Sequence, residues 1–193
     1  MEALTISIPK FVDEVVAAAG TIDHDEARMR LAIALSRANV ERGGGPFGAV
    51  LFAGFQVIAA GVNLVLDTGY SIAHAEIVAL MRAQQRLAAE RGNPGSLTLV
   101  TSTEPCCQCY GAVVWSGVDH LVCGADTSDA EAIGFDEGPK PSAWAYELER
   151  RGIRVTQGVC RADARAVLQD YVKRGGPIYG LRHPSLRGRP ATS

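Results

Sequence analysis

Two short groups of metal-binding side chains, about thirty residues apart, constrain the fold of this chain more than any other feature. The first is His-Ala-Glu at 74–76 and the second is Pro-Cys-Cys-Gln-Cys at 105–109. Cys106 and Cys109 are three positions apart, so on a helix they share a face and can hold one ion. With His74 they make three protein ligands, which leaves the fourth tetrahedral position of a zinc ion for water, as in catalytic sites. The fold must therefore bring the two segments together.

The order and spacing of the two segments distinguish a catalytic metal site from its alternatives. A lone His-Ala-Glu is commonly a surface tripeptide, and a lone Cys-x-x-Cys can be a redox pair or half of a structural zinc site. A structural site needs a fourth protein ligand, but His24, His120 and His183 lack motif spacing. Cys107 would point about 100° away around a helix. We therefore predict an open zinc site in which Glu76 takes a proton from water and passes it to the substrate.

Composition favours a cytoplasmic domain with a small, nearly neutral substrate. The 193 residues are 47% apolar, which predicts one domain over 1–193 with a core at about 23–174. The net charge of −2 gives no field that would attract nucleic acid or a membrane. The N-terminus lacks a basic segment followed by an apolar run, and no 18-residue apolar stretch appears, so we expect neither a leader segment nor a membrane span. Three of the five cysteines cluster, which indicates metal chemistry, whereas Cys123 and Cys160 are predicted to be small buried residues.

The hydrophobic pattern predicts alternating strands and helices. The expected helices span 23–43, 74–91, 106–115, 142–150 and 161–173, and the first has capping-box spacing at Asp23 and Glu26. The expected strands span 49–52, 57–60, 97–101, 121–124 and 153–156, the first two as an antiparallel hairpin. Such alternation implies parallel crossovers with helices on both faces. The predicted fold class is α/β, a three-layer α/β/α sandwich with a mixed five-stranded sheet and an irregular tail over 175–193.

Further motifs carry a family resemblance. In chain order they are Gly-Gly-Pro-Phe-Gly-Ala at 44–49, Gly-Val-Asn at 61–63, His-Ala-Glu-Ile at 74–77, Thr-Glu-Pro-Cys at 103–106 and Gly-Phe-Asp-Glu-Gly-Pro at 134–139. Over roughly residues 25 to 180 the chain resembles the bacterial guanine deaminases of the cytidine deaminase superfamily. The last motif is similar to one bacterial branch that also handles amino-triazines. Ser102 and Gln108 depart from the family pattern, where cysteine and methionine are usual.

The resemblance implies a cytidine-deaminase-like fold and a zinc-dependent hydrolytic deaminase that converts guanine to xanthine and ammonia. It implies one Zn²⁺ per chain, held by His74, Cys106 and Cys109, and a homodimer. The catalytic carboxyl groups would be Glu76 and Glu137. Glu137 would complete the pocket and assist proton transfer.

The resemblance also places four residues at the substrate. Asn63 would hydrogen-bond the purine, Phe47 would pack against its plane, and Ala75 and Glu104 would complete the binding site, with Glu104 holding the zinc loop through backbone contacts. Without the resemblance, Asn63 would be interpreted as a turn residue and Phe47 as a core residue. Trp115 is expected to pack in the core.

Three alternatives stay open at this point. The first is the same chemistry on another small heterocycle, such as ammeline or another amino-triazine, cytosine or a nucleoside. The second is a tRNA adenosine deaminase, which needs a basic surface, whereas Arg182, Arg187 and Arg189 lie in a tail. The third is a binding module with a structural zinc, which would release no ammonia from any amino-heterocycle.

Overall fold

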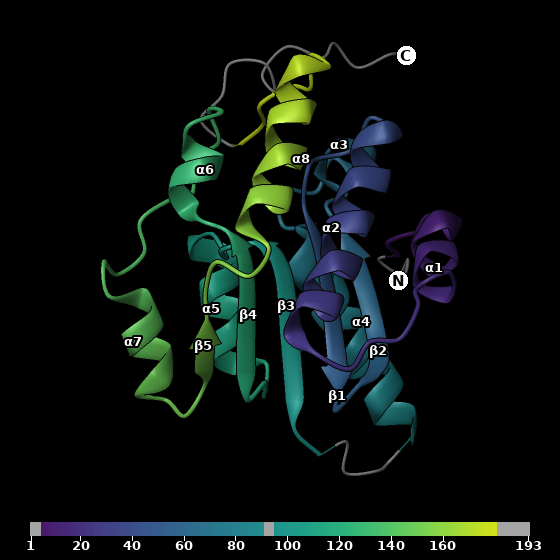
Figure 1. The fold of residues 1–193 in the computed structure, drawn as a ribbon, viewed down its shortest axis with the longest axis vertical. Helices are drawn as coiled ribbons and strands as arrows, with labels where there is room; N and C mark the ends of the chain where they lie inside the picture. The colour runs from purple at the N-terminus through teal and green to yellow at the C-terminus, as the bar shows by residue number, and fades with distance from the viewer. Residues whose placement is uncertain (1–4, 91–94, 181–193) are drawn as a thin grey trace.

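The computed structural model describes residues 5–90 and 95–180, which form helices around one mixed sheet (Figure 1). In chain order the elements are α1 (Lys10–Ala17), α2 (Asp25–Glu41), β1 (Gly48–Ala53), β2 (Gln56–Val62), α3 (Val65–Thr68), α4 (Ala75–Glu90), β3 (Leu97–Thr103), α5 (Cys107–Trp115), β4 (His120–Ala125), α6 (Thr127–Glu131), α7 (Trp144–Glu149), β5 (Arg154–Thr156) and α8 (Arg161–Lys173).

The sheet has the strand order β2-β1-β3-β4-β5. Strand β1 is antiparallel to both β2 and β3, whereas β3, β4 and β5 are parallel to one another. The predicted hairpin and the predicted mixed five-stranded sheet are therefore confirmed. Because β3 and β4 are parallel neighbours, their carboxyl ends lie side by side, and the loops that leave these ends carry polar residues to one edge of the sheet.

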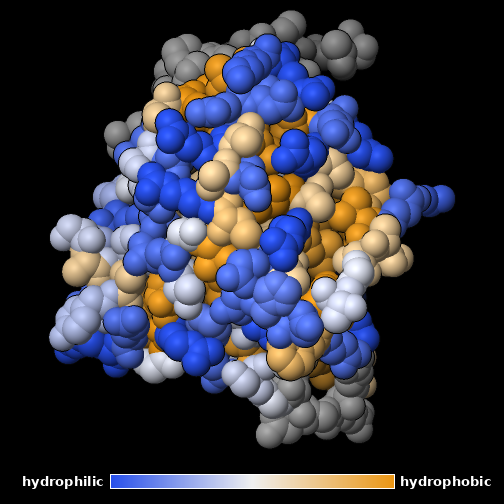
Figure 2. All heavy atoms as spheres, in the orientation of Figure 1, coloured by the Kyte–Doolittle hydropathy of each residue, from blue (hydrophilic) through white to orange (hydrophobic). Residues whose placement is uncertain are grey.

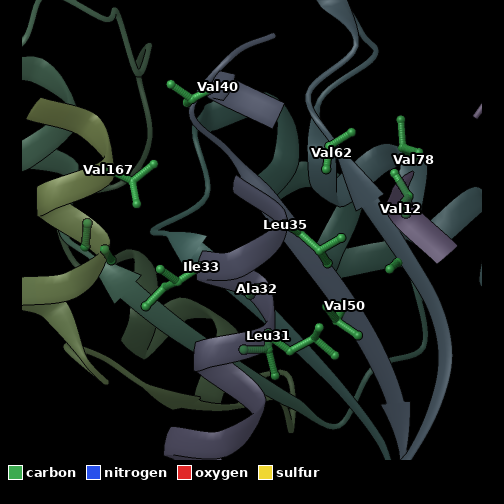
Figure 3. Close-up of a cluster of buried hydrophobic side chains, with 14 of the residues drawn as sticks. Val12, Leu31, Ala32, Ile33, Leu35, Val40, Val50, Val62, Val78 and Val167 are labelled. Carbon is green, nitrogen blue, oxygen red and sulfur yellow. The ribbon is translucent and has the colours of Figure 1, made fainter. Parts of the chain in front are cut away.

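Helices cover both faces of the sheet, so the predicted three-layer arrangement is confirmed. Figure 1 shows α1, α2 and α8 in front of the sheet and α4 and α5 behind it. Side chains alternate along a strand, so Val50 and Val100 join the front core while Leu51 and Leu99 join the back core. Figure 3 shows part of the front core, where Leu35 of α2 lies in the same layer as Val50 of β1.

Two glycines allow helices to lie close against the sheet. A Cβ on Gly48 would collide with the carbonyl oxygen of Ala32 in α2, and a Cβ on Gly61 would collide with that of Ala75 in α4. The second contact holds the first turn of α4 against β2. Since His74 directly precedes this turn, the close approach fixes where the first predicted metal ligand lies.

Helix α2 differs from the predicted helix at its start. It begins at Asp25, its N-cap residue is His24, and no side chain caps it. Asp23 lies outside the first turn and instead contacts Nδ1 of His24 at 2.6 Å. The predicted capping box at Asp23 and Glu26 is therefore wrong. Similarly, α4 begins at Ala75 rather than at His74.

Figure 2 shows the outer face of the α1–α2–α8 layer, where hydrophilic residues predominate and apolar ones appear between them. No helix within residues 5–90 and 95–180 is long and apolar enough to cross a membrane. Residues 176–180 contain no regular element, as predicted. The last residue of the helix predicted over 74–91 and the rest of the tail, with His183, Arg182, Arg187 and Arg189, lie outside the described residues.

Candidate active site

The three predicted metal ligands meet at the starts of α4 and α5. His74 precedes α4, Cys106 is the N-cap residue of α5, and Cys109 lies within the first turn of α5. Nδ1 of His74 lies 3.4 Å from Sγ of Cys106 and 3.6 Å from Sγ of Cys109. All three ligand atoms lie within 4.8 Å of one another.

These separations fit a zinc ion. Tetrahedral bonds of about 2.0 to 2.3 Å place neighbouring ligand atoms about 3.6 Å apart. The donor set of one imidazole and two thiols is also one that zinc prefers. His74, Cys106 and Cys109 could therefore hold the ion and leave one position open for water.

The electrostatics of the cluster also suit a cation. The hydrogen bond between the two thiols, together with His74, lowers the pKa of Cys106 to about 4. The same hydrogen bond raises the pKa of Cys109 well above its ordinary value. Burial by itself lowers the pKa of His74, but the hydrogen bond to Cys106 and the nearby acids raise it. The protein alone thus favours one thiolate, and a bound cation would stabilise the second.

Two buried carboxyl groups complete the cluster. Glu76, in the first turn of α4, is 8% exposed, and burial followed by the charge of Cys106 raises its pKa. Glu137 is 6% exposed, and burial, Cys106 and Glu76 raise its pKa to about 8. A carboxyl group with a raised pKa exchanges its proton closer to physiological pH than an ordinary carboxyl group does. The site therefore contains two candidates for proton transfer.

Asn63 follows β2 at the edge of the site and is buried. Its Oδ1 accepts a hydrogen bond from the backbone N–H of Val65 at 3.1 Å. Its backbone oxygen accepts a hydrogen bond from Nδ2 of Asn39 at 2.9 Å. These bonds show the turn role expected of an asparagine, and they fix the orientation of its side-chain amide.

The other predicted substrate residues have contacts within the protein. Phe47 packs edge-to-face on Phe135 with ring centroids 5.0 Å apart. The side chain of Ala75 is buried in the back core, so only its backbone can face a ligand. Glu104 accepts hydrogen bonds from the N–H and Oγ1 of Thr127 and from Nε2 of Gln157. Glu104 thus connects the loop before α5 to two later segments, through side chains as well as backbone.

Sequence reasoning did not single out Tyr179, which its position makes a candidate for the site. Its side chain is buried, and within the described part of the chain its Oη has no hydrogen-bond partner. A Cβ on Gly45 would collide with this hydroxyl and lie 3.1 Å from Oδ1 of Asn63. Burial, with the charges of Glu76 and Glu137 among others, raises the pKa of Tyr179. An unpaired buried hydroxyl beside Asn63 is suited to a ligand, but no sequence motif surrounds it.

Trp115 does not pack in the core. It was expected in the core, but it is 86% exposed at the end of α5. The α5 helix buries Cys109 and Val113, which are four positions apart, and Trp115 lies beyond Val113 on another side of the helix. Apolar character alone therefore misplaced it.

The remaining cysteines and the two departures from the family pattern have structural contacts. Cys123 is buried as predicted, whereas Cys160 is half-buried at the start of α8. Cys107 lies against Gly138, where a Cβ would collide with its Sγ. Ser102 accepts a hydrogen bond from the N–H of Gly48 at 3.1 Å, and Gln108 donates to the backbone oxygen of Ile72 at 3.3 Å.

Comparison with known proteins identifies the class. Residues 22–125 match the family model of the cytidine and deoxycytidylate deaminase zinc-binding region. The chain therefore belongs to this deaminase family, and it is a hydrolytic deaminase.

Within this family, the chain is similar to deaminases of guanine and of tRNA adenosine. The structure is similar to a guanine deaminase from Nitrosomonas europaea, with a TM-score of 0.82 and 45% identity over 88% of this chain and 96% of that chain. The chain is 36% identical over 113 residues to a guanine deaminase of Bacillus subtilis (strain 168), covering 58% of this chain and 71% of the relative. It is also 35% identical over 158 residues to a tRNA-specific adenosine deaminase of Haemophilus influenzae, covering 79% of this chain and 85% of the relative.

Proposed function

We propose that this protein converts guanine to xanthine and ammonia by zinc-dependent hydrolysis. The observation that carries the proposal is the placement of two buried acids, Glu76 and Glu137, at one His/Cys/Cys cluster. The similarity to the Nitrosomonas guanine deaminase, at nearly full length, supports guanine as the substrate. One Zn²⁺ per chain fits the single open ligand set formed by the described residues.

The residues divide the chemistry between them. Zinc, when bound, lowers the pKa of water toward neutrality. Glu76 takes the proton of the attacking water and delivers it to the ring nitrogen N3, so it must change protonation state twice in each cycle. Glu137 protonates the departing amino group or contacts the N1 and amino edge. Burial raises the pKa of both acids, because the loss of water disfavours the charged carboxylate.

Substrate recognition is assigned to the rim of the cluster. The amide of Asn63 contacts one edge of the purine, Phe47 packs against its plane, and the hydroxyl of Tyr179 closes the pocket beside them. Ala75 contributes through its backbone at the start of α4. A site built from such polar groups rejects analogues that leave them unpaired.

The assembly and the compartment are part of the proposal. We propose that one deaminase domain over 1–193 forms a homodimer. Two apolar side chains on the α4 and α5 helices are exposed, Met81 at 49% and Trp115 at 86%. They support a subunit interface on this face. The oxidisable thiol ligands suit the reducing cytoplasm. Light scattering of the purified protein tests the dimer.

A substrate panel tests the function. Ammonia release by the zinc-loaded protein should give the highest kcat/KM with guanine, above guanosine, cytosine, cytidine and adenine, with ammeline as a second substrate. A tRNA anticodon stem-loop belongs in the same panel because of the tRNA-specific relative. Preference for cytidine or for the RNA would reject guanine while leaving the zinc hydrolysis intact.

A further inference from the structure

Lys140 connects three segments beside the metal-ligand cluster. It lies in the loop between α6 and α7, and its Nζ donates a hydrogen bond to the backbone oxygen of Pro105 at 2.7 Å and to Oγ1 of Thr127 at 2.6 Å. The same ammonium lies 4.9 Å from the ring centroid of Trp144. Pro105 directly precedes the ligand Cys106, so this side chain joins the Glu137 loop to the ligand loop.

The hydrogen bonds around Thr127 have only one consistent direction. A lysine ammonium can only donate and a carboxylate can only accept. The hydroxyl of Thr127 therefore accepts from Lys140 and donates to Oε2 of Glu104, the second bond being 2.7 Å long. Lys140 is half-buried, and such charge-assisted bonds are stronger where water is partly excluded. Both bonds hold the ammonium against the backbone of the ligand loop and the start of α6.

Glu137 has a second attachment to the same region. Its backbone oxygen accepts a hydrogen bond from the N–H of Cys107 at 2.9 Å. Gly138 has a φ of +68° and lies so close to Cys107 that a Cβ would collide with its Sγ. The loop is therefore fixed on the start of α5 at residue 137 and again, three residues later, at residue 140. The carboxyl group of Glu137 is buried next to the first attachment, where the loss of its hydration is costly unless neighbouring groups compensate for it.

We propose that Lys140 is a positioning residue that holds Glu137 at the metal-ligand cluster by fastening its loop to Pro105 and Thr127. The inference rests on the proposed function, because the part that Glu137 plays in deamination belongs to that proposal. Lys140 acts through Glu137 and contacts no predicted metal ligand side chain.

Kinetics of Lys140→Met in the zinc-loaded, full-length protein test the inference. Methionine keeps an unbranched apolar chain of nearly the same length but removes the charge and the donors. We expect kcat for guanine to fall roughly 10- to 100-fold, as for other small displacements of a catalytic group, with zinc content unchanged. In a Glu137→Gln background the same substitution should add less than about a twofold loss, because the carboxyl group it positions is already absent. Lys173→Met, on the exposed side of α8, is the matched control and should leave kcat unchanged.

Hydrogen–deuterium exchange gives a readout that needs no activity. Peptides covering 106–109 and 134–141 should exchange faster in Lys140→Met than in the wild type, because the N–H of Cys107 loses its partner when the loop moves. If Lys140→Met does not fold, Lys140→Gln, which keeps one donor group without the charge, is measured in the same way.

Two results would overturn the inference. One is an unchanged kcat together with unchanged exchange over 134–141, and the other is an equal loss of kcat in the wild-type and Glu137→Gln backgrounds. If the wild type does not deaminate guanine, the proposed function fails, and the exchange over 134–141 still decides whether Lys140 holds the loop.

Discussion

At the residue scale, a substitution at Glu76 can test proton transfer without removing a metal ligand. Its carboxyl group is buried beside the ligands, yet the three ligand atoms are supplied by other residues. Glu76→Gln should keep zinc and fold but lose turnover by about 10²- to 10⁴-fold, since an amide can neither take a proton from water nor return it. Metal analysis checks that zinc is retained, and steady-state kinetics measure the loss of turnover. Activity within about threefold of the wild type would remove Glu76 from the mechanism.

Cys106 should be indispensable for the metal. Cys106→Ala leaves only two of the three ligand atoms, so zinc and activity should be lost together. Cys107→Ser is the control, because Sγ of Cys107 lies against Gly138 and the residue is not among the clustered ligands. The control should retain zinc at the wild-type ratio when metal content is measured per chain. Full zinc occupancy in Cys106→Ala would show that the ligands are wrongly assigned.

Tyr179 should contribute to binding rather than to proton transfer. Its Oη is buried beside Asn63 without a partner in the described residues, so a bound purine would supply one. Tyr179→Phe should raise KM for guanine about fivefold with little change in kcat, the effect of one ordinary hydrogen bond. Tyr146→Phe, which alters an exposed ring on α7, is the matched control. If both variants give the wild-type KM, the hydroxyl of Tyr179 does not contact the substrate.

At the element scale, His120 links the parallel strands β4 and β5. Its Nε2 lies 2.9 Å from Oγ1 of Thr156, and its Nδ1 lies 3.0 Å from Nη2 of Arg154. Since a guanidinium only donates, Nδ1 must accept, and the ring is neutral. Burial lowers the pKa of His120, and the charges of Arg154 and Arg28 lower it further against the opposing effect of Asp25.

This shift predicts a pH dependence of stability. Because the pKa of His120 is lower in the folded state than its unfolded value of about 6.5, protonation favours the unfolded chain. The contribution of His120 is complete above that unfolded value and is lost as the pH falls through the folded-state pKa. In urea unfolding with saturating zinc, His120→Gln should therefore lose less stability than the wild type between about pH 7 and pH 5. Equal losses in the two proteins would contradict the prediction.

The elements themselves show what a sequence pattern can and cannot predict. Strands β1 to β4 and helix α8 follow from apolar runs and helical periodicity, which depend only on neighbours in the chain. The helices α1, α3 and α6 have no counterpart among the expected helices. Helix α6 is held by a capping box between Asp126 and Asp129 and by Arg161 from α8, a partner that is distant in sequence. The contact with Arg161 has no local signature, because it depends on how α8 packs.

At the scale of the whole molecule, the site also combines residues with a local sequence pattern and residues placed by distant contacts. The cluster of His74, Cys106 and Cys109 was predictable because zinc ligands need a fixed spacing and chemistry. Tyr179 and Lys140 were not, because both reach the site through contacts with residues far away in the sequence. The prediction that Trp115 lies in the core was wrong for a different reason. An apolar side chain on an amphipathic helix can face solvent or a partner as well as a core.

Direct conversion of guanine tests the central claim. The zinc-loaded protein incubated with guanine should produce xanthine and ammonia in equal amounts, measured by chromatography and by an ammonia assay. Removal of the metal with a chelator should abolish both products, and added zinc should restore them. Failure of the fully zinc-loaded protein to form xanthine from guanine would contradict the account.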